Sequence, residues 1–393
     1  MSVALIVELF AALVLFGLLI RSAMKTNWRD AGTGTYVGYG IAFLALAWVA
    51  YYYFKSKYFP ANPAVPEGNF FRWAFQGFVF LSIAGFLFRE LGKRVGTPGM
   101  RKLFRNMPVT AAFGILIILV YAITAIFAGV LAPYGEAEIF ARANVLPGAN
   151  AATGGDPAHL LGTDQIGRDI LSRLIFGARN TVGIAFVTTC LAFFIGGTLG
   201  FLAATLGGWV DQVCSRVVDA LMAIPQLIFA LLLMTIATAW AGSNAALITL
   251  YMVLIIAVLD STRVFRLSRA VGLNIVVMDY IEAAKLRGEN LGYLIFREIL
   301  PNATAPLLAE FGLRFCFVFL TIAALSFLGI GIQPPRADWG TMVRDLSPFI
   351  NFAQFSPLTA ALPLMAAGAI ALLTVAVNFV VDWMLHRSSG LKE

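Results

Sequence analysis

The sequence predicts an all-α polytopic membrane protein. Of its 393 residues, 60% are hydrophobic and 12% are charged, against the roughly 25% charge that is usual in soluble domains. Several apolar runs reach the roughly 20 residues that a helix needs to cross a bilayer. We find no series of alternating segments of about 10 residues, which would indicate a membrane β-barrel. The composition therefore favours a bundle of membrane-spanning helices.

Nine apolar segments are candidate spans. The first opens with MSVALIVELF and has no basic segment before it, so we interpret it as a retained span and not as a cleaved signal peptide. The sixth is the least uniform, because Arg216 and Asp219 lie near its start. The predicted spans are 3–20, 36–54, 70–88, 108–131, 180–206, 217–240, 244–264, 308–332 and 359–385.

The segment 89–107 sets the expected orientation, because it holds six basic residues and one acid. Positively charged loops stay in the cytoplasm, so this segment is predicted to lie inside. Counting spans from it places the N-terminus outside and the C-terminus inside. The segment 132–179 is then outside, and the segment 265–307 is inside. The basic residues of 89–107 are Arg89, Lys93, Arg94, Arg101, Lys102 and Arg105.

The same segment divides the chain. We expect an accessory three-helix extension at 1–88, a basic cytoplasmic linker at 89–107 and a functional core at 108–387. Residues 1–107 carry 12 Lys and Arg against 4 Asp and Glu, whereas the remainder carries 16 against 17. This basic excess lies beside apolar runs, which fits membrane topology and not nucleic-acid binding.

Two kinds of chemistry find no support in the sequence. The three cysteines and two histidines are isolated from one another and show no metal-ligand spacing. No G-x-x-x-x-G-K-[ST] stretch offers a cradle for the phosphates of ATP. We therefore expect neither a metal nor another cofactor in this chain.

The polar stretch YIEAAKLRGENLGYLIFREILPN, residues 280–302, stands out in this apolar chain. We predict a helix over 279–287 that ends at Gly288, and a second helix that Asn290 caps and that stops before Pro301. On the first helix, one face of small residues would let another protein approach, with Glu282, Lys285 and Glu289 at its rim. The alternative is a solvated loop. The expected docking face consists of Tyr280, Ala283, Ala284 and Arg287.

The outer segment 161–180 combines charge with an amphipathic pattern. Its apolar residues predict a helix that lies along the membrane surface. Asp164 and Asp169 fit a packed network with Arg168 and Arg173 better than a catalytic pair. The apolar residues of the pattern are Leu171, Leu174 and Ile175.

Glu310 and Arg314 lie within the predicted eighth span. Ionisable groups inside a membrane are expensive and often mark a transport pathway. Their i, i+4 spacing also allows them simply to pair with each other. Both interpretations stay open.

The polar stretch resembles the EAA loop of permease subunits of bacterial ABC importers. The resemblance implies that this loop is a coupling helix that enters a groove on a cytoplasmic ATPase. The commonest form of the pattern has Ile at the position of Glu298, so the match is not complete. The matching residues are Glu282, Ala283, Ala284, Gly288, Leu300 and Pro301.

Two further segments are similar to dipeptide, oligopeptide and nickel permeases. LSFLGIGIQPPRADWGTMV at 325–343 resembles one of that subfamily's segments, and 161–180 resembles GTDxxGRDxxSRxxxGxR. Many relatives carry an acid at the position of Ile322 and a Trp near Asp260, and these departures leave the identity of the substrate open. The matching residues of 161–180 are Gly162, Thr163, Asp164, Gly167, Arg168, Asp169, Ser172, Arg173, Gly177 and Arg179.

The resemblance implies a six-helix ABC importer permease core preceded by three extra transmembrane helices, in a bacterial cytoplasmic (inner) membrane. The chain would be a non-catalytic subunit that couples ATPase motion to alternating access for peptides or similar small solutes. Implied partners are a second homologous permease, two cytoplasmic ATPases that carry ATP and Mg, an extracytoplasmic solute-binding protein and membrane lipids. A secondary transporter is the alternative, although no inverted repeat is visible. An intramembrane enzyme would require convergent polar residues within the spans.

Overall fold

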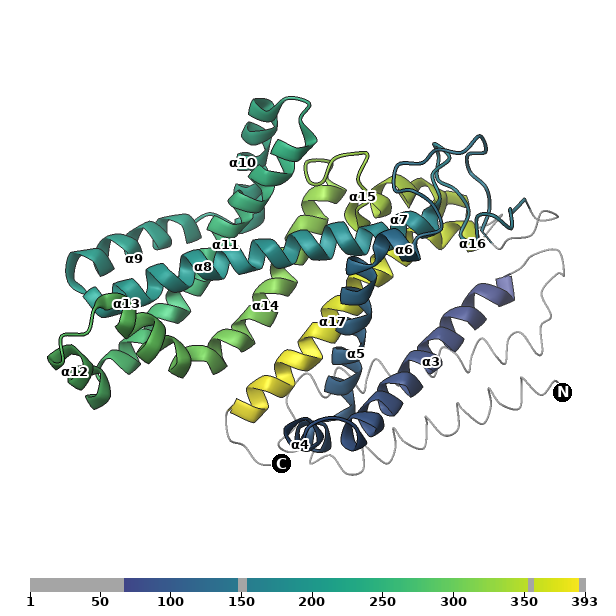
Figure 1. Ribbon diagram of the computed structural model, residues 1–393. Coiled ribbons are helices and arrows are strands. Elements are labelled where there is room, and N and C mark those ends of the chain that lie inside the picture. Colours follow the sequence, from purple (N-terminus) through teal and green to yellow (C-terminus); the bar gives the residue numbers. More distant parts are fainter. Residues whose placement is uncertain (1–66, 148–153, 353–356, 389–393) are drawn as a thin grey trace.

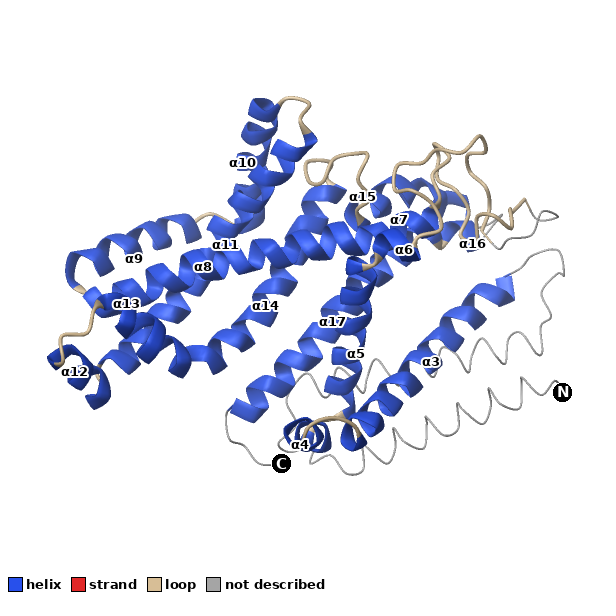
Figure 2. Ribbon diagram, in the orientation of Figure 1, coloured by secondary structure: helices blue, strands red, loops and turns tan. Residues whose placement is uncertain are grey.

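The computed structural model describes residues 67–147, 154–352 and 357–388 (Figure 1). The regular elements of these residues are helices, and their β-structure is limited to isolated bridges (Figure 2). The predicted spans 3–20 and 36–54 lie outside the described residues. The described helices are α3 Glu67–Arg94, α4 Pro98–Asn106, α5 Val109–Ile126, α6 Ala128–Leu131, α7 Ile170–Gly177, α8 Gly183–Leu206, α9 Gly208–Met222, α10 Gln226–Ala241, α11 Ala245–Val276, α12 Asp279–Leu286, α13 Leu291–Tyr293, α14 Leu300–Phe327, α15 Trp339–Leu346, α16 Pro357–Ala360 and α17 Leu362–Ser388.

Five helices among the described residues are long and apolar enough to cross a membrane. A sixth crossing results if the bent pair α9 and α10 counts as one span. The predicted all-α polytopic class is therefore confirmed. Helix α3 has 28 residues and contains the predicted third span, 70–88. The five long helices are Val109–Ile126, Ile170–Leu206, Ala245–Val276, Leu291–Phe327 and Leu362–His386.

The predicted helix within 161–180 forms, but it is not separate from the span that follows it. Helix α7 continues through a π-helical turn, Ala178–Val182, into α8, and together they form one run of 37 residues. At 1.5 Å per residue this run is about 55 Å long, more than a bilayer requires. The apolar residues Leu171, Leu174 and Ile175 are half-buried within the fold. The amphipathic pattern thus reflects packing between helices.

The predicted sixth span, 217–240, is also not a straight helix. Helices α9 and α10 meet at an angle of 89°, with Pro225 between them. Proline lacks a backbone N–H and disfavours helical backbone at the residue before it, so the chain bends there. Helix α10 consequently stands out from the long helices, packed beside α11 (Figure 1).

The closest helix pair in the bundle is α8 with α11, and glycine makes the approach possible. A Cβ on Gly196 would lie 2.3 Å from the Ser261 carbonyl oxygen, and a Cβ on Gly200 would lie 2.7 Å from that of Phe265. Small residues of this kind let membrane helices pack backbone to backbone. The main apolar core extends from this pair to α5, α14 and α17.

Gly196→Ala is expected to destabilise the bundle by about 1–3 kcal/mol, because the added methyl group meets backbone atoms that cannot move aside. Gly197→Ala is the matched control, since its Cβ would come no closer than 4.0 Å to the Ser268 hydroxyl. Thermal unfolding in detergent measures both variants. Equal stability of the two would contradict the packing argument.

Candidate functional site

Helix α12 confirms the predicted first helix of the polar stretch, and its end is a glycine cap. Gly288 has φ +80°. Its N–H donates to the Lys285 carbonyl at 3.0 Å, and the N–H of Glu289 donates to the Ala284 carbonyl at 3.2 Å. These two bonds are the Schellman arrangement, in which glycine takes the left-handed position after the last helical residue.

The expected docking face of α12 is divided between two sides of the helix. Ala284 is fully buried, together with Ile281, in a cluster with residues of α11, α13, α14 and the π-helical segment that precedes α14. Tyr280 and Arg287 are exposed, as are Glu282, Ala283 and Lys285. Ala284 therefore anchors the helix to its own chain and does not face outward.

The exposed side of α12 also carries apolar side chains that the sequence pattern did not single out. Leu286 is 84% exposed and Val277, just before the helix, is 79% exposed. Packing within the chain does not account for Leu286 on the last turn of this short polar helix, because most of its side chain is exposed. Leu286 and Val277 are therefore the apolar side chains that this side of α12 offers to a partner.

The second predicted helix begins as expected but does not end before Pro301. The Asn290 side chain accepts a hydrogen bond from the Tyr293 N–H at 2.8 Å and caps the helix. The chain then continues through a π-helical segment, Leu294–Ile299, into α14, with the half-buried Leu300 and the exposed Pro301 at the start of α14. A π turn contains one residue more than an α turn, so it shifts the hydrogen-bond pattern of the residues that follow. Pro301, which has no backbone N–H to donate, joins the helix after this shift.

Gly288→Ala is expected to loosen the end of α12 at a cost of about 1 kcal/mol, because an L-residue with a Cβ resists positive φ. Space is not the reason, since nothing lies within 4 Å of an added Cβ. Gly288→Asn should cost less, because asparagine tolerates this conformation. Hydrogen exchange of the amides in 279–290 measures the effect. Equal protection of these amides in Gly288→Ala and Gly288→Asn would show that the positive φ of Gly288 does not stabilise the end of α12.

At the other end of the bundle, residues 161–169 form a compact turn before α7. We call this turn, together with Arg173 of α7, the charged turn. Asp164 accepts hydrogen bonds from the backbone N–H of Ile166 at 3.1 Å and of Arg168 at 2.9 Å. Its other carboxylate oxygen lies 2.7 Å from the Arg168 Nε and 3.9 Å from the Arg173 Nε. These three charged side chains are almost entirely buried, and Asp345, 3.9 Å from the Arg168 Nη2, supplies a second carboxylate for the two arginines.

Asp169 begins the long helix that follows this turn. Its carboxylate accepts from the Ser172 N–H and hydroxyl, both at 2.7 Å, and so caps α7. Its other oxygen lies 2.9 Å from the Nδ1 of His159, a buried contact that the sequence did not predict. The turn also contains Thr163, whose hydroxyl donates to the Arg142 carbonyl at 2.9 Å. Gly162 and Gly167 have positive φ and lie against backbone, where a Cβ would not fit.

The structure packs the two outer segments against each other. The Trp339 ring lies against Gly177, and its Nε1 donates to the Leu174 carbonyl at 2.9 Å. The Asp338 carboxylate caps α15 and accepts from the Thr181 hydroxyl at 2.7 Å. Burial raises the pKa of this carboxyl. The segments 161–180 and 325–343 therefore form one unit.

Inside the bundle, Glu310 and Arg314 pair at 2.7 Å, and Asp260 joins them. The Arg314 Nη1 lies 3.8 Å from an Asp260 oxygen, whose other oxygen accepts from the Gln226 side chain at 2.6 Å. Arg314 also lies over the Phe317 ring at 4.6 Å. The cluster ties α10, α11 and α14 together. An acid within the predicted span 244–264 is the sequence signal that points to Asp260.

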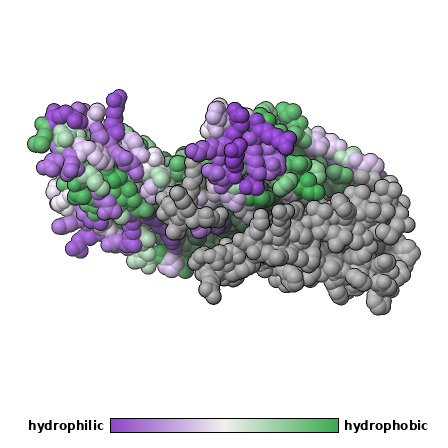
Figure 3. Space-filling view, turned by 90° about the horizontal axis from the view of Figure 1, so that it is seen from below, coloured by the Kyte–Doolittle hydropathy of each residue, from purple (hydrophilic) through white to green (hydrophobic). Residues whose placement is uncertain are grey.

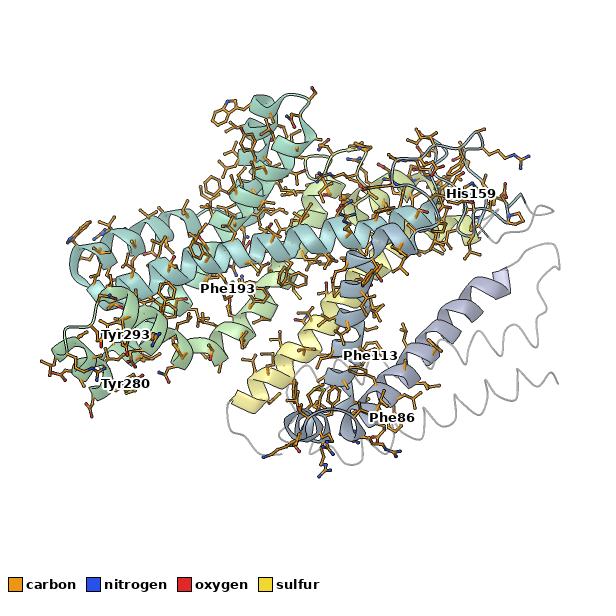
Figure 4. All side chains as sticks on the ribbon, viewed as in Figure 1. Phe86, Phe113, His159, Phe193, Tyr280 and Tyr293 are labelled. Atoms are coloured by element: carbon orange, nitrogen blue, oxygen red, sulfur yellow. The ribbon has the colours of Figure 1, made fainter. Side chains whose placement is uncertain are left out.

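The two charged regions outside the spans lie at opposite ends of the bundle. Tyr280 and Tyr293 mark the α12 end in Figure 4, and His159 marks the other. The fold and this arrangement define a multi-pass membrane protein with charged segments at both ends of its helical bundle, the class to which membrane transport subunits belong.

Comparison with known proteins specifies the family. The family model described as "binding-protein-dependent transport system inner membrane component" matches residues 194–389. The chain belongs to this family of ABC importer permeases, in its peptide and nickel branch. It is thus a permease, the membrane-spanning subunit of a transport system.

Curated relatives agree over most of their own length. The dipeptide transport system permease protein DppC of Escherichia coli (strain K12) is 39% identical over 272 residues, which are 69% of this chain and 86% of the relative. The glutathione transport system permease protein GsiD of Pectobacterium atrosepticum is 33% identical over 255 residues, 64% of this chain and 80% of the relative. These relatives support the permease interpretation and give no support to a secondary transporter.

Proposed function

We propose that this permease imports peptides or solutes of similar size, driven by ATP that separate subunits hydrolyse. Its expected partners are a second homologous permease, two cytoplasmic ATPases that carry ATP and Mg, and an extracytoplasmic binding protein. Relatives named for dipeptide and glutathione transport support the substrate class. No part of the hydrolysis falls to this chain, and its role is to convert ATPase motion into alternating access.

The geometry of α12 carries the proposal. Its buried side, Ile281 and Ala284, packs on the apolar cluster that also includes the start of α14, so a force on α12 is transmitted to a long span. Its exposed side offers Tyr280, Glu282 and Leu286 to a partner. A short helix that is fixed on one side and free on the other suits a coupling element. Leu300 and Pro301 lie where this loop joins α14.

The charged turn and α15 support, from beneath, the surface that we assign to the binding protein. They lie at the end of the bundle opposite α12, as delivery from outside requires (Figure 1). Their buried ion pairs make this surface rigid. In this arrangement α12 and the C-terminus lie in the cytoplasm and the N-terminus lies outside, which is the orientation that the basic segment 89–107 predicts.

For the cluster of Glu310, Arg314 and Asp260, we favour a structural role over a pathway role. The Arg314 side chain is 7% exposed and has two carboxylates and an aromatic ring around it. Charged groups within a bundle that pair with one another avoid the cost of facing lipid alone. Glu310 is the more accessible member, at 22%, and is the residue that a passing solute would meet first.

Purification from a native membrane under mild conditions, followed by uptake assays, tests the proposal. The chain should co-purify with ATPase subunits, and vesicles loaded with ATP on the ATPase side should accumulate a labelled dipeptide. Uptake that follows an ion gradient and ignores ATP would contradict the proposal and favour a secondary transporter.

A further inference from the structure

The helical turn between α3 and α5 forms a basic surface for which the transport function gives no reason. Helix α3 ends at Arg94, the chain turns at Gly96 with φ +104°, and α4 begins at a Thr97 cap. Helix α5 then starts at Val109, directly after Pro108. We call Arg94, Arg101, Lys102 and Arg105 the basic elbow.

Aromatic packing fixes α4 across the ends of its neighbours. Phe104 is buried and meets the Phe88 ring edge-on at 5.3 Å. A Cβ on Gly92 would lie 2.4 Å from the Phe104 ring, so glycine is needed for this contact. Met107 is fully buried in the same cluster, which Trp383 of α17 completes. The elbow is therefore part of the packed fold.

The basic side chains of the elbow point away from this packing. Arg101, Lys102 and Arg105 are exposed, and Lys102 lies on the side of α4 opposite Phe104. Among the described residues, no ion pair includes them, whereas the neighbouring Lys93 pairs with Glu90. Figure 3 views the molecule from the α4 end and shows a hydrophilic patch over α4 and the adjacent end of α3.

The elbow lies at the edge of the apolar part of the molecule. The neighbouring turns of α3 expose Phe86 and Leu87, and α5, which is long and apolar enough to cross a membrane, begins at Val109. A short amphipathic helix at such a boundary lies in the plane of the membrane surface, with its cations at the depth of the headgroups. Anionic headgroups attract clustered Lys and Arg at this depth.

From this arrangement we propose that the basic elbow binds the headgroups of anionic phospholipids. Bound anionic lipids offset the positive charge of Arg101, Lys102 and Arg105, which no ion pair of the described residues includes, and hold α4, and with it α3 and α5, at the membrane surface. Charge complementarity favours an anionic lipid, and the depth of α4 favours a membrane component over a soluble anion.

Native mass spectrometry of the full chain in detergent, titrated with phosphatidylglycerol or phosphatidylcholine, tests this proposal. In R101Q/K102Q/R105Q, affinity for phosphatidylglycerol should fall roughly tenfold or more, since each Lys or Arg near an anionic surface contributes substantially. Binding of phosphatidylcholine should not change. Added salt should weaken phosphatidylglycerol binding to the parent chain, because it screens charge.

Two further variants serve as controls. R142Q/R179Q/R336Q removes three exposed cations at the opposite end of the bundle and should leave phosphatidylglycerol binding intact. R101K/R105K retains the charge and should bind like the parent, which separates loss of charge from loss of folding. Unchanged lipid affinity in R101Q/K102Q/R105Q would overturn the proposal. An equal loss of phosphatidylglycerol affinity in R142Q/R179Q/R336Q would also overturn it. So would a result in which R101Q/K102Q/R105Q retains its lipid affinity but loses a co-purifying protein subunit.

Discussion

Leu286→Asp is expected to lower ATP-driven uptake at least tenfold while the chain remains folded. The side chain is 84% exposed, so its replacement should change the free energy of unfolding by less than about 0.5 kcal/mol. A hot-spot residue near the centre of a protein interface costs about 2 kcal/mol or more of association free energy when it is removed, and a charge at that position adds to the loss. A loss of that size weakens binding about 30-fold. Co-purification of the ATPase and dipeptide uptake are the measurements.

Two matched variants make the Leu286 experiment specific. Leu160→Asp changes an exposed leucine at the opposite end of the molecule and should leave ATPase binding intact. Ala284→Asp places a charge in a fully buried position and should reduce the amount of folded chain. Normal ATPase binding and uptake in Leu286→Asp would show that α12 is not the coupling surface.

Asp164→Ala is expected to destabilise the charged turn by about 3–5 kcal/mol, because it removes the nearest carboxylate of the buried Arg168 and Arg173 and leaves only the more distant Asp345. It also removes the acceptor for two backbone N–H groups. Thermal unfolding in detergent should show a markedly lower midpoint. Asp164→Asn should be milder, since the amide oxygen can still accept from the backbone.

Asp219→Ala is the control for Asp164. Asp219 pairs with Arg266, but their side chains are 61% and 54% exposed, and exposed pairs contribute at most about 1 kcal/mol. If both aspartates cost the same to remove, the buried network does not stabilise the turn. If only Asp164→Ala unfolds the outer segment, binding-protein docking should be lost with it.

Local features of the fold were predictable because nearby residues decide them. Gly288 ends α12 and Asn290 caps the following helix, as the sequence predicts, since each acts on backbone groups within a few residues. Prolines were harder. Pro225 bends the chain by 89°, whereas Pro301 lies in a helix that continues. The difference lies in the π-helical segment before Pro301, which no composition rule identifies.

The candidate site was predictable as a set of segments but not as a set of contacts. The polar stretch and the two outer segments were recognisable in the sequence. Which side of α12 faces out was not, and Ala284 proved to be buried. The pairing of Asp169 with His159 was likewise not visible, and neither was the contact of Trp339 with Gly177, because these residues are separated in the chain.

The sequence by itself determined the class of this protein, because apolar runs of sufficient length must form helices in lipid, and glycine and asparagine end and begin helices through local backbone geometry. Only the tertiary structure decided which side chains meet. Asp260 lies beside Arg314 because α11 and α14 pack together, and α12 exposes Leu286 because Ile281 and Ala284 occupy the apolar cluster. Such contacts depend on how helices that are distant in the sequence pack together. The burial of the whole bundle fixes these positions, and no single segment encodes them.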